Sequence, residues 1–197
     1  MPNVSAVKAK FFEPDGADND QVSATGSAIT LVIADGGPYG NLTETITLTS
    51  SADNSGRTFV ITGTDGNGDA QTETVTGPDT ATVSSANKYA TVTSIVASGP
   101  ITTQIQAGIL GTGALTGVVF AGRTRIRGIT GTSKAVAGSI VFKNTSITGT
   151  SLLTIPLTGA VSSIDPYIPD NGVLFDAGAY VNLTAASVTG VTVYYDG

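Results

Sequence analysis

Alternating hydrophobic and polar positions recur along this chain and predict β-strands. Between residues 42 and 49, Leu42, Ile46 and Leu48 fall on one face of an extended segment, while threonines occupy the other. Such alternation is typical of a strand that is buried on one side. Glycines and β-branched residues interrupt every stretch long enough for three helical turns, so helices are not expected. The pattern therefore predicts an all-β protein.

Two strand-like runs, at residues 57–64 and 70–76, flank a segment that is rich in turn formers. That segment, residues 65–69, reads Asp-Gly-Asn-Gly-Asp, and its glycines supply the positive φ that a tight hairpin connection needs. Its alternating oxygen side chains also match the start of a calcium loop. However, Ala70 stands where the EF-hand pattern requires glycine, and Thr76 stands where it requires glutamate. We expect a β-hairpin turn here and no metal site.

The strand series is interrupted by the glycine-rich segment 108–113, which we interpret as a domain boundary. Short strand-like runs at regular spacing follow it and suggest a sandwich or jelly-roll-like domain. The predicted fold is all-β, with two small antiparallel β-sandwich or jelly-roll-like domains and an extended N-terminal segment. The predicted boundaries are 1–22 for the arm, 23–112 for the first sandwich and 113–197 for the second.

Composition limits the partners that this chain is expected to bind. Only 12% of the residues are charged, and the net charge is −6. Because this balance attracts neither polyanions nor anionic lipid, no nucleic-acid or membrane partner is expected. The sequence contains no apolar run of membrane-spanning length, and its first residues contain none of signal-peptide length. We therefore expect a soluble protein that is made in the cytoplasm.

The chain contains no histidine and no cysteine. The usual general base near neutral pH, the commonest metal ligand and the thiolate nucleophiles are therefore missing. A glycosidase could still use two carboxylates across a cleft, but those of this chain fall in turns or on a threonine-rich strand, and tryptophan is absent. We expect no enzymatic activity, no catalytic residue, no metal and no cofactor. The carboxylates considered are Glu44, Asp65, Asp69, Glu73, Asp165, Asp170 and Asp176.

Arg123, Arg125 and Arg127 alternate with uncharged residues, so a strand would present all three guanidinium groups on one face. They could pair with carboxylates of a partner subunit or contact phosphate. Alternatively, they form a solvated strand face whose charges deter edge-to-edge aggregation. Of the functional alternatives we favour a protein interface, because the interleaved aromatic residues of nucleic-acid-binding surfaces are missing.

The N-terminal segment and a pair of tyrosines complete the candidate interface. The segment is acidic around Pro14 and Gly16, while Tyr194 and Tyr195 must point to opposite faces of a strand, so that one can fill the core and the other contact a neighbour. Core packing is expected for most tyrosines of the last third, which also include Tyr167. The predicted interface residues are Glu13, Asp15, Asp18, Asp20, Arg123, Arg125, Arg127, Tyr194 and Tyr195.

Two stretches resemble structural proteins of tailed bacteriophages. Residues 57–77 resemble a β-domain of such proteins, and the C-terminal half is similar to the small β-sandwich that closes many of their virion proteins. The resemblance implies a capsid decoration or cement protein that stabilises the head by binding coat-protein subunits. It also implies a virion location after assembly in the host cytoplasm, major capsid protein or other virion proteins as partners, and a homo-oligomer such as a trimer. In the C-terminal half the resemblance rests on residues 123–129, 140–143, 168–175 and 191–195.

Two other functions are kept as alternatives. One is a tail, connector or fibre-associated structural protein that binds a receptor or glycan, although the absence of tryptophan weakens a sugar platform. The other is a carboxylate hydrolase that acts on polysaccharide. The first predicts saturable binding to host cells or surface polysaccharide, and the second predicts release of reducing sugar.

Overall fold

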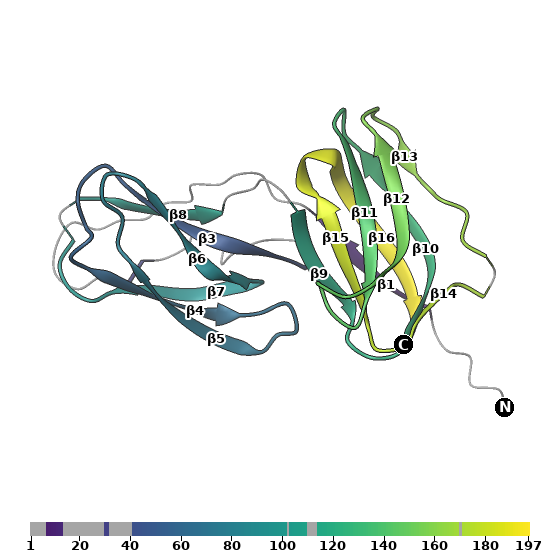
Figure 1. Cartoon of the computed structure of the whole chain (residues 1–197), viewed down its shortest axis with the longest axis horizontal. Coiled ribbons are helices and arrows are strands. Elements are labelled where there is room, and N and C mark those ends of the chain that lie inside the picture. Colours follow the sequence, from purple (N-terminus) through teal and green to yellow (C-terminus); the bar gives the residue numbers. More distant parts are fainter. Residues whose placement is uncertain (1–6, 14–29, 32–40, 102, 110–113, 170) are drawn as a thin grey trace. The chain divides into compact units, whose positions relative to one another are not determined.

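The computed structural model describes residues 7–13, 30–31, 41–101, 103–109, 114–169 and 171–197. These residues form antiparallel β-strands and one short 3-10 turn at Ala185–Ser187. The prediction of an all-β fold is confirmed. The strands fall into two compact units, each with its own hydrophobic core (Figure 1).

One sheet of the first unit is centred on the C-terminal strand of the chain. β16 (Val188–Asp196) pairs with β1 (Lys8–Phe12) on one side and with β10 (Thr124–Ser133) on the other. β14 (Val173–Phe175) pairs with the first residues of β10, and the two-residue strand β13 (Ser163–Ile164) pairs with its last residues. The order across this sheet is therefore β1, β16, β10 and then β14 or β13.

A second sheet packs against the first to close the core. Its order is β9 (Ala114–Phe120), β15 (Ala179–Thr184), β11 (Ala137–Asn144) and β12 (Ser151–Thr158). Apolar side chains of both sheets fill the space between them, as alternation along each strand dictates. From the first sheet they include Phe12, Ile126, Phe175 and Val193, and from the second Leu115, Ile140, Phe142 and Leu183.

The strand order of this unit is that of a jelly roll. When β1, β9, β10, β11, β12, β14, β15 and β16 are named B to I in chain order, the two sheets read B-I-D-G and C-H-E-F. This order arises when a ribbon of four antiparallel strand pairs is rolled into a two-layer barrel. The unit is referred to below as the jelly-roll unit.

Residues 8–12 of the predicted N-terminal arm are not a free arm but form β1, the edge strand B of the jelly roll. The strand signal is weak because Lys8 and Lys10 occupy the same strand face as the inward-pointing Phe12. Lys10 is nevertheless accommodated: its Nζ donates a hydrogen bond to the Val118 carbonyl at 2.7 Å and lies 5.8 Å from the centroid of the Phe12 ring. Burial of this side chain lowers the pKa of Lys10.

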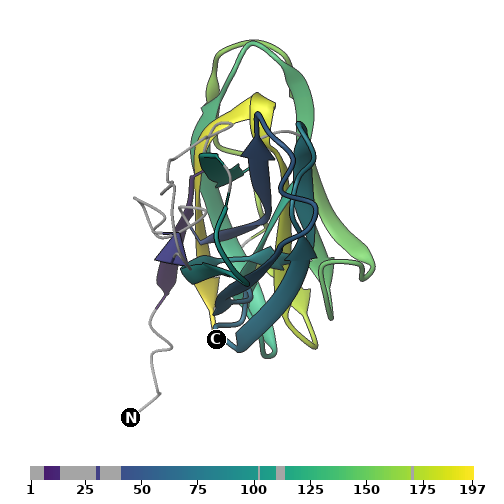
Figure 2. The same cartoon turned by 90° about the vertical axis from the view of Figure 1, so that its left-hand side faces the viewer.

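The second unit is inserted in the sequence between β1 and β9, and it is referred to below as the inserted unit. One layer has the order β2 (Thr30–Leu31), β7 (Thr91–Ala97), β4 (Thr58–Thr64) and β5 (Ala70–Thr76). The other has β6 (Thr82–Tyr89), β3 (Leu42–Ser50) and β8 (Ile105–Ile109). Figure 2 shows these strands from a second direction. The core between the layers includes Ile46, Leu48, Phe59, Ile61, Tyr89, Ile95 and Ile105.

The predicted hairpin at residues 65–69 joins β4 and β5. Asp65 shapes the turn: its Oδ1 accepts hydrogen bonds from the Asn67 amide at 2.8 Å and from the Asp69 amide at 3.0 Å. Gly68 has a φ of 89°, which only glycine adopts without strain. The aspartate and glycines of this segment therefore have the turn-forming roles that the sequence predicts.

Replacement of Phe12 tests whether β1 is an integral strand of the jelly roll. Phe12 is fully buried, whereas the neighbouring Phe11 is 47% exposed and lies over Gly190. We expect Phe12→Ala to lower the free energy of unfolding of the jelly-roll unit by about 3–5 kcal/mol, because it leaves a large cavity. Phe11→Ala should cost under about 1 kcal/mol. Urea denaturation followed by circular dichroism would measure both, and equal losses would contradict the placement of β1.

The buried phenol of Tyr89 should make the stability of the inserted unit depend on pH. Burial of the phenol, with a smaller contribution from the nearby charge of Glu73, raises the pKa of Tyr89 above its ordinary value of 10.0. Above that pH the unfolded chain loses the phenol proton while the folded chain keeps it. The contribution of Tyr89 to the free energy of unfolding is therefore fully present below pH 10.0 and is lost as the pH rises further. Tyr89→Phe should flatten this fall in urea titrations between about pH 9 and 11. Parallel curves for the two proteins would contradict the expectation.

Candidate functional site

Of the three predicted arginines, Arg123 directly precedes β10, and Arg125 and Arg127 lie near its start, on the outer face of the jelly roll. Thr124 and Ile126, which alternate with them, are 3% and 0% exposed. The register between β10 and β16 shifts between Ile126 and Gly128, so Arg127 is the extra residue of a β-bulge. The bulge leaves Arg127 on the solvent side while Ile126 stays in the core.

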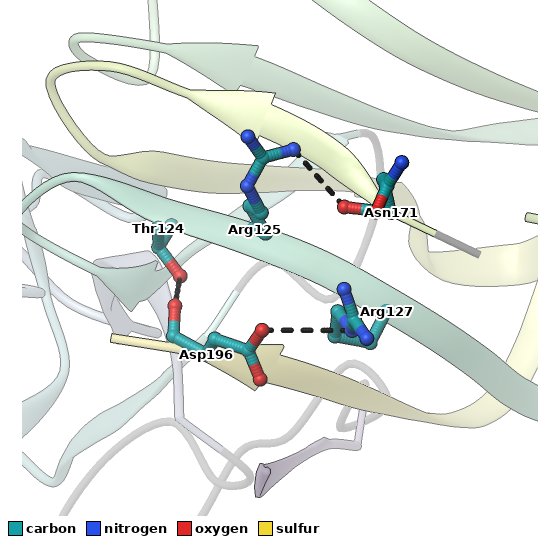
Figure 3. A network of polar contacts seen from close by, with 5 residues as sticks. All are labelled: Thr124, Arg125, Arg127, Asn171 and Asp196. Carbon is teal, nitrogen blue, oxygen red and sulfur yellow. Dashed lines mark hydrogen bonds and ion pairs between the residues drawn. The ribbon is translucent and has the colours of Figure 1, made fainter. Parts of the chain in front are cut away.

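Each arginine contacts a different partner. The Nε of Arg127 lies 3.5 Å from Oδ2 of Asp196. The Nη1 of Arg125 donates a hydrogen bond to the Asn171 carbonyl at 3.0 Å. Figure 3 shows the Arg125 side chain extending toward Asn171 and the Arg127 side chain toward Asp196. The arginines therefore share a sheet face but do not converge on one point.

The charges of Arg123 and Arg125 are the least neutralised of the three. Arg123 lies 3.5 Å from Oδ1 of Asp176, but both side chains are about 70% exposed, so water screens this ion pair. Arg125 bonds to a neutral carbonyl rather than to a carboxylate. Both arginines line a shallow depression of about 330 Å³. Its lining residues are Arg123, Thr124, Arg125, Leu174, Asp196 and Gly197.

The two adjacent tyrosines point to opposite faces of β16. Tyr195 is 9% exposed and packs in the jelly-roll core, with its ring centroid 6.0 Å from that of Phe120. Tyr194 is half-buried on the outer face, where a Cβ on Gly128 would lie 3.4 Å from its ring. Of the pair, Tyr194 is therefore the one with a ring surface that a partner could reach.

The acidic N-terminal candidates are only partly described. Glu13 is exposed directly after β1. Asp15, Asp18 and Asp20 lie outside the described residues. Their role in an interface stays a prediction.

The structure points to an exposed aromatic residue that the sequence analysis did not select. Tyr167 is 87% exposed, and Val161 in the same connection between β12 and β14 is 71% exposed. Tyr167 follows Pro166, and the next residue, Ile168, packs against the jelly-roll core, which anchors the segment. The signal available in the sequence was the Pro-Tyr-Ile-Pro run, since prolines restrict the backbone and hold a side chain in place.

The carboxylates considered for catalysis lie on several strands and connections, and Asp65 and Asp69 share the β4–β5 turn. Glu44 is 4% exposed in β3, and its Oε1 accepts a hydrogen bond from the Thr45 amide at 2.8 Å. Its Oε2 has no hydrogen-bond partner among the residues that the structure describes. Glu73 accepts hydrogen bonds from the Ala86 and Asn87 amides at 2.7 and 2.8 Å. Asp165 borders a groove beside β12. Asp170 lies outside the described residues.

Within the described part of the chain, no three acidic side chains lie close enough together to hold a metal ion. None of its helical segments has the length and apolar character needed to cross a bilayer.

Comparison with known proteins found little similarity. No protein-family profile matches the sequence, and no curated protein does. Among solved structures, the chain is similar to the major capsid protein P2 from bacteriophage PM2, with 15% identity over 96% of this chain and 97% of that chain. The TM-score is 0.23, and a similarity this low carries no argument about fold or function.

A double-mutant cycle would measure how strongly Arg127 is neutralised within the jelly roll. The side chains of Arg127 and Asp196 are 35% and 24% exposed, so the pair is better shielded than Arg123 and Asp176. We expect Arg127→Ala and Asp196→Ala to show a coupling of up to about 1 kcal/mol in urea denaturation. The same cycle on Arg123 and Asp176 should show less coupling. A larger value for the exposed pair would contradict this view of the charges.

Proposed function

We propose that this chain is a structural protein of a bacteriophage virion, of the decoration or cement type, which stabilises the head by binding assembled coat protein. The observation that carries the proposal is the jelly-roll order of β1 and β9–β16. Jelly rolls are recurrent in viral capsid proteins. This step is an analogy at the level of the fold, and it agrees with the phage resemblance of the sequence.

Jelly rolls also occur in lectins and cupins. The amino-acid composition helps to distinguish these functions from a role in a capsid. The chain contains no histidine, the commonest metal ligand in proteins, so it cannot build a metal site from imidazole ligands inside the barrel. It contains no tryptophan for a sugar-binding platform. These features support binding and assembly over catalysis, and we propose that the protein is not an enzyme.

The proposed mechanism is mass action. A protein that binds the assembled shell, and not its separated subunits, stabilises the shell by the free energy of that binding. Tyr167 is the side chain best placed to anchor such a contact, because it is almost fully exposed on a proline-bounded segment. Large aromatic residues that become buried at the centre of an interface supply much of its affinity.

Tyr167→Ala tests this proposal. Because the side chain is 87% exposed, its removal should leave the unfolding curve unchanged. Binding to assembled coat shells of the virus that carries this chain, measured by cosedimentation, should weaken about tenfold or more. Val136→Ala is the control, since Val136 is also exposed, at 47%, but lies outside the connection between β12 and β14 that carries Tyr167. We expect it to bind like the unaltered protein.

The same experiment distinguishes the alternative function. Failure of the unaltered protein to bind shells, together with saturable binding to host cells or surface polysaccharide, would overturn the decoration role. That result would favour a tail-associated receptor-binding or glycan-binding protein.

A further inference from the structure

Charge is unevenly divided between the two parts of the chain. Residues 13–113, which lie between β1 and β9 in the sequence, contain two Lys or Arg and eleven Asp or Glu, a net charge of −9. The remaining residues, which include every strand of the jelly roll, contain seven Lys or Arg and four Asp or Glu, a net charge of +3. One chain therefore carries a basic and an acidic part that are complementary to each other.

The basic part has a defined place where the charge is accessible. Arg123 and Arg125 border the same depression, and among the described residues neither guanidinium is paired with a shielded carboxylate. Asp196 also lines the depression, but its carboxylate pairs with Arg127. The apolar edge of Leu174 lies in the same lining. A guanidinium group whose donors are not all used can bind a carboxylate through two parallel hydrogen bonds. The depression is therefore suited to an acidic, narrow element of a protein.

The acidic part presents such an element at the tip of the β4–β5 hairpin. Asp69 is exposed there, and within the described part of the chain its carboxylate makes no hydrogen bond or ion pair. Asp65 beside it uses Oδ1 to hold the turn. The turn contains Gly66 and Gly68, so it is narrow at its end. Glu73 differs, because its carboxylate accepts two backbone amides.

We propose that the depression at Arg123 and Arg125 of one copy of this chain binds the β4–β5 hairpin tip of a second copy, with Asp69 as the central carboxylate. The two surfaces are different, so the contact is head-to-tail. Each pair of copies then retains one unused depression and one unused tip, and further copies add until a ring closes or a linear chain forms. This self-association does not depend on the proposed binding to coat protein.

Charge reversal tests the contact, because it can break the contact and then restore it. One variant is Arg123→Glu with Arg125→Glu, which keeps the acidic tip. The other is Asp69→Lys, which keeps the basic depression and leaves Asp65 to shape the turn. By sedimentation velocity at low salt, we expect the unaltered protein to associate and each variant alone to associate at least about tenfold more weakly. An equimolar mixture of the two should regain association, because the unaltered acidic tip of the first variant fits the unaltered basic depression of the second. The reversed depression and the reversed tip that remain are also opposite in charge, so larger assemblies of alternating copies are allowed.

Two matched variants control for net charge. Asp79→Lys changes the charge of the inserted unit by the same amount at another exposed position. Lys134→Glu combined with Lys143→Glu changes the charge of the jelly-roll unit by as much as the double arginine variant does, away from the depression. Both should associate within about threefold of the unaltered protein, and raising the salt to roughly 0.5 M should weaken association in every case. Circular dichroism would confirm that all variants fold.

Three results would overturn the contact. They are a monomeric unaltered protein at low salt, a mixture of the two reversed variants that stays monomeric, and a loss in Asp79→Lys as large as that in Asp69→Lys. Shell binding would be measured on the same variants. Self-association that fails while shell binding persists removes only this inference, and the opposite outcome removes only the proposed function.

Discussion

The jelly roll depends on the pairing of β16 with β1 on one side and β10 on the other. These three strands come from the two ends and the middle of the chain, and the inward side chains of β16 form the floor of the core. Without β16, β1 would have no partner among the described strands, and Phe12 would lose its apolar surroundings. The long loops that this pairing closes cost conformational entropy, which burial of the two inner faces must offset.

The same pairing determines what the outer face displays. Once Ile126 and Val193 point into the core, the bulge at Arg127 and the half-buried ring of Tyr194 are placed on the solvent side. Asp196, one strand away, pairs with Arg127 and leaves Arg123 and Arg125 as the less neutralised charges. A surface of this kind is suited to recognition between proteins, where charge gives selectivity and an aromatic anchor gives affinity.

The two units are stabilised separately and differ in charge. Each has its own core, and the inserted unit has lysine or arginine at only two positions in the sequence, Arg57 and Lys88. A low content of charged residues in the chain as a whole reduces repulsion between copies, so local complementarity can decide how they meet. The division of charge, more than the total of −6, is the feature that bears on assembly.

Several features were predictable from the sequence because they depend on neighbouring residues. Alternation reports which face of a strand is buried, so the all-β class and the opposite orientations of Tyr194 and Tyr195 could be read directly. Backbone preferences of aspartate and glycine determine the turn at 65–69 in the same local way.

Three features could not be predicted from the sequence. They are the strand order, the membership of residues 8–12 in the jelly roll, and the insertion of one unit between β1 and β9. The alternation within a strand does not encode which distant strand lies beside it. The partners of the three arginines and the exposure of Tyr167 follow from that long-range pairing, so only the tertiary structure decided them.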